Sequence, residues 1–268
     1  MKNLPATIIL SALLATMAGC GEADEETAAA TSTKSIAITE TVAPETVAAV
    51  ATSVKISAAM GMANANHWNQ TVTITPLGAY VMGNPDAPVK LVEYGSRTCP
   101  ACGQLGRDGL KPLEEKYVAS GKVSFEYRDF LIHGAPDLAA AMIGRCGPKD
   151  KYFPMLAAMY ADQAATLDRI QAMPAAEAKA LEGKGAAAIA TAFAKRAGYM
   201  TLGRRFGLSD AAMSACLSDS KQIDQLTRIY NDADAKVVLG TPTLLINGRK
   251  TDAISWQQLE TALKKAGA

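Results

Sequence analysis

Residues 89–102 read Val89-Lys-Leu-Val-Glu-Tyr-Gly-Ser-Arg-Thr-Cys-Pro-Ala-Cys102, so that a Cys-x-x-Cys motif follows directly on an apolar run. The run from Val89 to Tyr94 predicts a buried strand that ends at Gly95. The residues from Pro100 to Ala119 favour a helix, in which Pro112 is expected to cause a kink. The motif is therefore expected between the end of a buried strand and the first turn of a helix.

A cysteine at the start of a helix has a distinctive chemistry. Unpaired backbone N–H groups and the helix dipole stabilise a thiolate there, so Cys99 is predicted to be the nucleophile of a redox-active disulfide with Cys102. Cys102, a turn inside the helix, is expected to resolve a mixed disulfide formed on Cys99. Two other interpretations stand beside this one: a zinc knuckle, which would need a second ligand pair at knuckle spacing, and a purely structural disulfide. We expect neither a metal nor another cofactor.

Further elements lie on both sides of the motif. Alternating residues predict an edge strand near Thr71–Thr75 and a second strand over Lys122–Phe130. At the far end, Thr243–Ile246 predicts a short strand, Asn247-Gly248 a hairpin turn, and Ile254–Ala266 a helix. Residues 135–235 are rich in Ala, Leu, Met and Lys without strand-like alternation. The sequence therefore predicts an α/β fold with an inserted all-helical subdomain.

The N-terminus predicts export. Leu4 to Ala18 is uncharged and too short for a comfortable membrane span. Met17-Ala18-Gly19-Cys20 resembles the lipobox of bacterial lipoproteins, which implies lipidation of Cys20; simple signal cleavage nearby is the alternative. Gly21 stands where inner-membrane lipoproteins usually carry Asp, which indicates a lipid anchor in the outer membrane, facing the periplasm. The predicted boundaries are a signal peptide at 1–19, a flexible tether at 20–70, the first half of the α/β domain at 71–134, the insertion at 135–235 and the second half at 236–268.

Composition excludes some partners and accounts for the cysteines. With 27 basic and 26 acidic side chains and no long Lys/Arg cluster, nucleic acid is not expected as a partner. Five cysteines are odd for an oxidising compartment, and removing Cys20 leaves two pairs. Cys146 and Cys216 are most simply a structural disulfide within the insertion, which closes some 70 residues and is worth about 4 kcal/mol from chain entropy. A second redox pair is the alternative.

Two stretches together resemble a known family. The run from Lys90 to Cys102 and the run Val238-Leu-Gly-Thr-Pro-Thr-Leu-Leu-Ile-Asn-Gly248 are similar to the DsbA-like branch of the thioredoxin superfamily. The resemblance covers roughly residues 77–266. It implies a thioredoxin fold with a helical insertion at the position found here, and dithiol–disulfide exchange in the bacterial cell envelope.

The resemblance also implies roles for individual residues. Pro242 would be the cis-proline that lies against the cysteine pair, and Thr241 would offer backbone hydrogen bonds to a substrate polypeptide; the alternative is an ordinary loop before a strand. Glu93 would be a buried acid that accepts the proton of Cys102, rather than an outward-facing strand residue. One departure concerns Ala101, because strongly oxidising members usually carry His there.

Three functions follow from these features. The leading hypothesis is an oxidase that forms disulfides in substrate polypeptides with free or mispaired cysteines and is reoxidised by a membrane redox partner. A reductase or isomerase is the second hypothesis. The third is a non-catalytic lipoprotein that binds a partner and in which the cysteine pair is a permanent structural disulfide.

Overall fold

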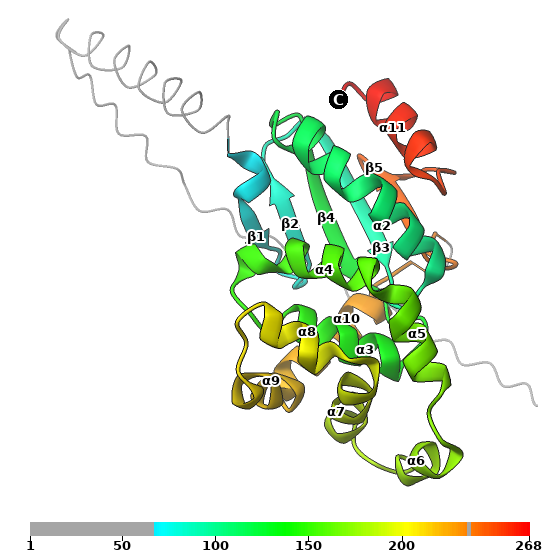
Figure 1. Ribbon diagram of the computed structural model, residues 1–268. Coiled ribbons are helices and arrows are strands. Elements are labelled where there is room, and N and C mark those ends of the chain that lie inside the picture. Colours follow the sequence, from blue (N-terminus) through cyan, green and yellow to red (C-terminus); the bar gives the residue numbers. More distant parts are fainter. Residues whose placement is uncertain (1–66, 235–236) are drawn as a thin grey trace, which may run out of the picture. The chain divides into compact units, whose positions relative to one another are not determined.

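A six-stranded sheet forms the centre of the computed structural model, which describes residues 67–234 and 237–268 (Figure 1). The expected signal peptide, the tether, a possible helix within 45–60 and Cys20 lie outside the described residues. The sheet has the order β1-β2-β4-β3-β5-β6. Its strands are β1 (Val72–Ile74), β2 (Tyr80–Gly83), β3 (Val89–Gly95), β4 (Val123–Asp129), β5 (Thr243–Ile246) and β6 (Arg249–Lys250).

Strand β3 lies inside the sheet, between β4 and β5. It runs parallel to β4 and antiparallel to β5. In this register Gly95 lies opposite Asp129, and Tyr94 lies opposite Thr243. The end of β3, the end of β4 and the start of β5 therefore meet at one edge of the sheet, which is where the Cys-x-x-Cys motif follows β3.

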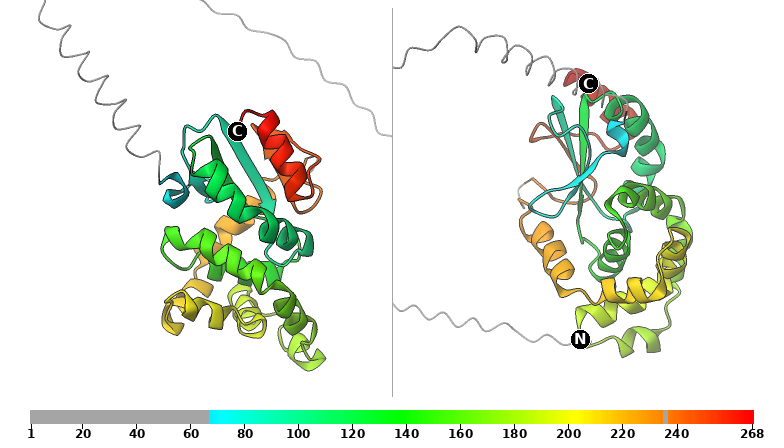
Figure 2. Two further views of the ribbon diagram at one scale, coloured as in Figure 1. Left: turned by 45° about the horizontal axis from the view of Figure 1, so that its top comes forward. Right: turned by 90° about the vertical axis from the view of Figure 1, so that its left-hand side faces the viewer.

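Two helices cover one face of the sheet, α2 (Pro100–Pro112) and α11 (Trp256–Lys265) (Figures 1 and 2). The Ser255 hydroxyl caps α11 by accepting a hydrogen bond from the Gln258 backbone N–H. The sequence predicted a kinked helix as far as Ala119, but α2 ends at Pro112 and a π-helical turn, η2 (Leu113–Val118), follows. Proline removes one intrahelical donor and its ring crowds the preceding turn, so the hydrogen-bond pattern changes there.

The chain between β4 and β5 is helical. Its elements are α3 (Ala135–Gly144), η3 (Lys149–Lys151), α4 (Tyr152–Ala161), α5 (Gln163–Gln171), α6 (Ala175–Ala180), α7 (Ala186–Ala197), α8 (Tyr199–Arg205), α9 (Asp210–Leu217) and α10 (Ser220–Asn231). Helix α4 serves two hydrophobic cores. Phe153 and Leu156 join the core under the sheet, whereas Met155 and Met159 join the core of the other insertion helices. The insertion is thereby packed onto the sheet domain.

The sequence prediction missed two short strands. Strand β2 pairs with β1 and β4, and β6 pairs with β5 after the turn at Asn247. Both are set by their partners in the sheet rather than by a long alternating pattern. A short 3-10 turn, η1 (Trp68–Gln70), precedes β1. In residues 67–234 and 237–268, no helix has the length and apolar character needed to cross a membrane.

Candidate active site

Cys99 occupies the N-cap of α2, and Pro100 is the first residue of that helix. The Cys99 sulfur lies 3.3 Å from the Thr241 carbonyl oxygen. Both cysteines of the motif are free thiols; Cys99 is 8% exposed and Cys102 is 0% exposed. An attacking thiol can therefore reach Cys99 but not Cys102.

The two thiols have opposite acidities. A hydrogen bond from the Cys102 thiol is the largest influence on Cys99. Together with the backbone N–H groups of Cys102 and Ala101, it lowers the pKa of Cys99 to about 5, against the opposing effect of burial. Burial raises the pKa of Cys102 well above its ordinary value, and the hydrogen bond to Cys99 and the charge of Glu93 add to the rise. Cys99 is thus a thiolate at neutral pH, while Cys102 keeps its proton.

Thr241 lies beside Cys99, and the peptide bond between Thr241 and Pro242 is cis. The Thr241 carbonyl contacts Cys99, and the Thr241 hydroxyl is buried without a hydrogen-bond partner among the described residues. A groove of about 420 Å³ runs along this loop and the segment after β6, between Leu239 and Ile254. These two apolar side chains are strongly exposed. The arrangement leaves room for a polypeptide next to Cys99.

Glu93 lies in the middle of β3 and points toward α2 and α11. Its side chain is buried, at 6% exposed, and Oε1 has no hydrogen-bond partner among the described residues. It lines a small cavity of about 10 Å³ with Phe125, Trp256 and residues of α2. Burial, and then the charge of Cys99, raises the pKa of Glu93 to about 8.

A buried ionic cluster supports the segment before Cys99. Arg97 donates from Nε to Asp129 over 2.7 Å, and Arg145 lies 3.5 Å from the same carboxylate. The hydroxyl of Tyr152 also donates to Asp129, over 2.8 Å. The sequence analysis did not find this cluster. Part of its signal was present, because Arg97 lies just after one predicted strand and Asp129 lies near the end of another.

A second carboxylate holds the same segment from the insertion. Asp137, in the first turn of α3, accepts hydrogen bonds from the hydroxyls of Ser96 and Thr98 over 2.8 and 2.7 Å. It also accepts from the backbone N–H groups of Thr98 and His133. Nothing in the sequence pattern relates Asp137 to the motif, since the contact exists only after the insertion has packed.

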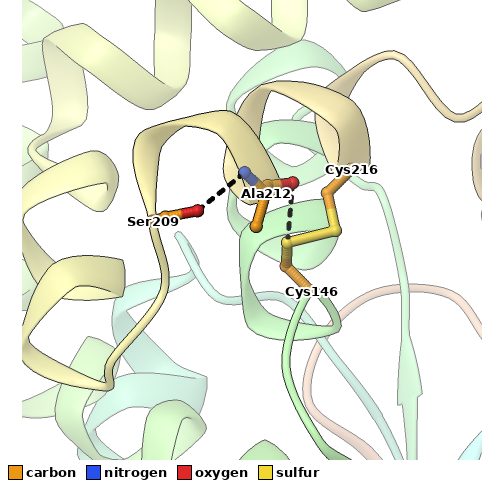
Figure 3. The surroundings of a disulfide bond; sticks show 4 residues. All are labelled: Cys146, Ser209, Ala212 and Cys216. Carbon is orange, nitrogen blue, oxygen red and sulfur yellow. Dashed lines mark hydrogen bonds between the residues drawn. A yellow bond between two sulfur atoms is a disulfide. The ribbon is translucent and has the colours of Figure 1, made fainter.

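Cys146 and Cys216 form a disulfide that joins the chain just after α3 to helix α9, with 5.7 Å between their Cα atoms (Figure 3). The Cys146 sulfur lies 3.5 Å from the Ala212 carbonyl oxygen. Ser209 caps α9 by accepting a hydrogen bond from the Ala212 backbone N–H. The bridge lies within the insertion, away from Cys99 and Cys102 in the chain.

Comparisons with known proteins agree with this fold. The family model for thioredoxin matches residues 75–265, and the chain belongs to this family. A protein-disulfide isomerase from Novosphingobium aromaticivorans is similar in structure, with a TM-score of 0.65 and 25% identity over 70% of this chain and 97% of that one. Alpha-DsbA1 of Wolbachia pipientis shares the fold, with a TM-score of 0.53 and 20% identity over 74% and 95% of the two chains.

The family match and these likenesses show a chain of the thioredoxin superfamily with the predicted DsbA-like fold. In sequence, the chain is 24% identical over 190 residues to a Rickettsia bellii protein that carries the provisional name protein-disulfide oxidoreductase. The alignment covers 69% of this chain and 63% of the relative. The chain thus spans about six-tenths of the length of the curated relatives it matches first.

Proposed function

We propose that this protein is a thiol–disulfide oxidoreductase that oxidises thiols of substrate polypeptides through Cys99 and Cys102. The acidity of Cys99 is the observation that carries the proposal, because a pKa lowered to about 5 leaves it as a thiolate at neutral pH. A stabilised thiolate favours the reduced form of the pair, and a pair that prefers to be reduced is a good oxidant. This supports oxidation over reduction despite Ala101.

The reaction transfers two electrons from the substrate to the cysteine pair. A substrate thiolate attacks Cys99 Sγ in the disulfide form, the Cys99–Cys102 bond breaks, and Cys102 leaves and takes up a proton. A second substrate thiolate then attacks the substrate sulfur of the mixed disulfide, which releases Cys99 as a thiolate and closes the substrate disulfide. Burial, the largest cause of the raised pKa of Glu93, acts in the disulfide form as well, so the Glu93 carboxyl can supply this proton to Cys102; in the reverse step it would accept the proton back.

The neighbouring groups are assigned supporting roles in this proposal. Thr241 and Pro242 border the groove in which the substrate chain would lie, with the backbone of Thr241 as its hydrogen-bonding edge. A membrane redox partner bearing a disulfide would reoxidise the cysteine pair. The cell envelope is the proposed location, with Cys20 as a lipid anchor in the outer membrane facing the periplasm, and the bridge between Cys146 and Cys216 is assigned a structural role.

Refolding of a reduced, disulfide-dependent protein tests the activity. With glutathione disulfide present as the terminal oxidant, catalytic amounts of the oxidised chain should accelerate disulfide formation, and Cys99→Ser should abolish the acceleration. The equilibrium constant of the pair against glutathione then distinguishes an oxidase from a reductase or isomerase. If the wild-type chain does not accelerate disulfide formation and Cys99 resists alkylation after mild reduction, the cysteine pair is a purely structural disulfide and the protein is a non-catalytic binding protein.

A further inference from the structure

Helix α2 contains three glycines at intervals of three residues, Gly103, Gly106 and Gly109, a composition that weakens a helix. A Cβ atom at Gly103 would collide with the side-chain amide of Gln163, one at Gly106 with the ring of Tyr160, and one at Gly109 with the ring of Trp256. Packing explains the second and third glycines, since each admits an aromatic ring. The first admits a polar group beside the reactive pair.

Gln163 is the first residue of α5 and reaches the motif from the insertion. Its side chain is buried, with the residue 3% exposed. Nε2 donates to the carbonyl oxygen of Cys99 over 2.9 Å and to the carbonyl oxygen of Arg97 over 3.1 Å. Both hydrogens of one amide group are thus used on the two carbonyls that flank Thr98. The Cys99 carbonyl also accepts from the Gly103 backbone N–H over 3.0 Å, so both of its lone pairs are occupied.

We propose that Gln163 is a positioning residue for the redox pair: its amide fixes the backbone of residues 97–99, and Gly103 provides the space in which that amide lies. The inference rests on the proposed function of Cys99 and Cys102. The orientation of the peptide units around Cys99 decides whether the N–H groups of the first turn point at the sulfur. The hydrogen bond from Gln163 to the Cys99 carbonyl therefore affects the stability of the thiolate without contacting the sulfur.

Gln163→Met tests the role of these hydrogen bonds, because methionine has a similar length and volume but no amide. All variants are made in the full chain with Cys20→Ser, so that in the reduced protein only Cys99 and Cys102 carry free thiols. The rate of alkylation of Cys99 is measured as a function of pH, together with the equilibrium constant of the pair against glutathione. Gln171→Met, the same change at the exposed last residue of α5, is the matched control.

Loss of the Gln163 hydrogen bonds should raise the pKa of Cys99 and shift the equilibrium with glutathione toward the disulfide form of the Cys99–Cys102 pair. The expected change is about three- to tenfold, the size of one net hydrogen bond. A tenfold change corresponds to about 30 mV in reduction potential. Gln171→Met should leave both quantities unchanged. A variant that melts at a lower temperature but titrates and equilibrates like the wild type would show that Gln163 only packs, and would overturn the inference.

Gly103→Ala supplies an independent test if Gln163→Met does not fold. In the wild-type background the new methyl group should displace the amide and change Cys99 as Gln163→Met does. In a Gln163→Ala background the space is free, so Gly103→Ala should cause no further change. Equal effects of Gly103→Ala in both backgrounds would refute the coupling. These outcomes test the role of Gln163 only if the wild-type protein is active. If the wild type is inactive and its Cys99 does not react with alkylating reagents, the proposed function itself is refuted.

Discussion

Glu93 provides a test of how burial controls the site. Burial, followed by the charge of Cys99, raises its pKa from the ordinary 4.5 to about 8. Between these two values the folded protein holds a proton that the unfolded chain has released. The free energy of unfolding must therefore fall as the pH rises through this window. Below the ordinary pKa both states hold the proton, so Glu93 does not lower the free energy of unfolding there.

The size of the fall follows from the two pKa values. Each pH unit within the window costs about 1.4 kcal/mol, so the whole fall from 4.5 to about 8 amounts to about 5 kcal/mol. Glu93→Gln keeps the size of the side chain but cannot ionise, and should remove the fall. The oxidised protein isolates the effect, because a bridged Cys99 does not titrate. Without the thiolate charge the pKa of Glu93 is lower, so the fall there is smaller than in the reduced protein.

Urea unfolding of the oxidised wild type and of Glu93→Gln, at pH values below and above the window, measures the fall directly. The wild type should lose stability with rising pH, and the variant should lose much less, so that the variant becomes the more stable protein at alkaline pH. Glu182→Gln, at an exposed position, should follow the wild-type profile. If the wild type and Glu93→Gln give parallel profiles, Glu93 ionises as freely in the folded protein as in the unfolded chain and the reasoning is wrong.

Three further outcomes are expected. Asp129→Asn should lower the free energy of unfolding by about 3–5 kcal/mol in urea titrations, because it leaves buried arginines without their carboxylate; a loss near zero would contradict this. Replacing Cys146 and Cys216 together by Ala should cost about 4 kcal/mol while the alkylation rate of Cys99 stays the same; a changed rate would mean that the bridge influences the active site. Just above pH 5 the reduction potential should fall by about 30 mV per pH unit, and below pH 5 by about twice that, since Cys99 takes up a proton only below its pKa. A single slope through pH 5 would refute the acidic thiol.

The sequence allowed prediction of the features that depend on local order. The strand before Cys99, the helix that starts at Pro100 and the strand at Thr243–Ile246 follow from apolar runs and turn residues within a few positions, and the structure has them. Burial of Glu93 was implied by the family resemblance rather than by the strand pattern, and the structure has this side chain buried. The roles assigned to Thr241, Pro242 and Glu93 came from the family resemblance and stay predictions.

Other parts of the site could not be predicted in this way. Gln163 and Asp137 lie more than 30 positions from the motif, and their neighbours in the sequence are ordinary helical residues. They reach residues 96–99 because helix α4 packs in two cores and places the helices next to it against the sheet. That packing depends on total volume and shape across the insertion, which no short pattern expresses.

The contrast between Glu93 and Cys99 follows from where each side chain leaves the backbone. Both are buried, and burial alone disfavours an anion. Cys99 stands at a helix start, where the Cys102 thiol, with the largest effect, and then the backbone N–H groups of the first turn donate to the sulfur, so its anion is stabilised despite burial. Glu93 leaves the middle of an interior strand, whose backbone donors are engaged with β4 and β5, and burial acts on it without compensation.

The two groups are also linked through charge. Reduction of the pair creates a thiolate on Cys99, and that charge raises the pKa of Glu93, so the carboxyl holds its proton more firmly in the reduced protein. Oxidation removes the charge, and Glu93 then releases a proton more readily, at the stage when a departing Cys102 thiolate needs one. We therefore expect Glu93 to bind its proton more tightly when the cysteine pair is reduced than when it is oxidised. This coupling is possible because Cys99 lies at a helix start, where its anion is stable, and Glu93 lies in an interior strand, where burial favours the protonated carboxyl.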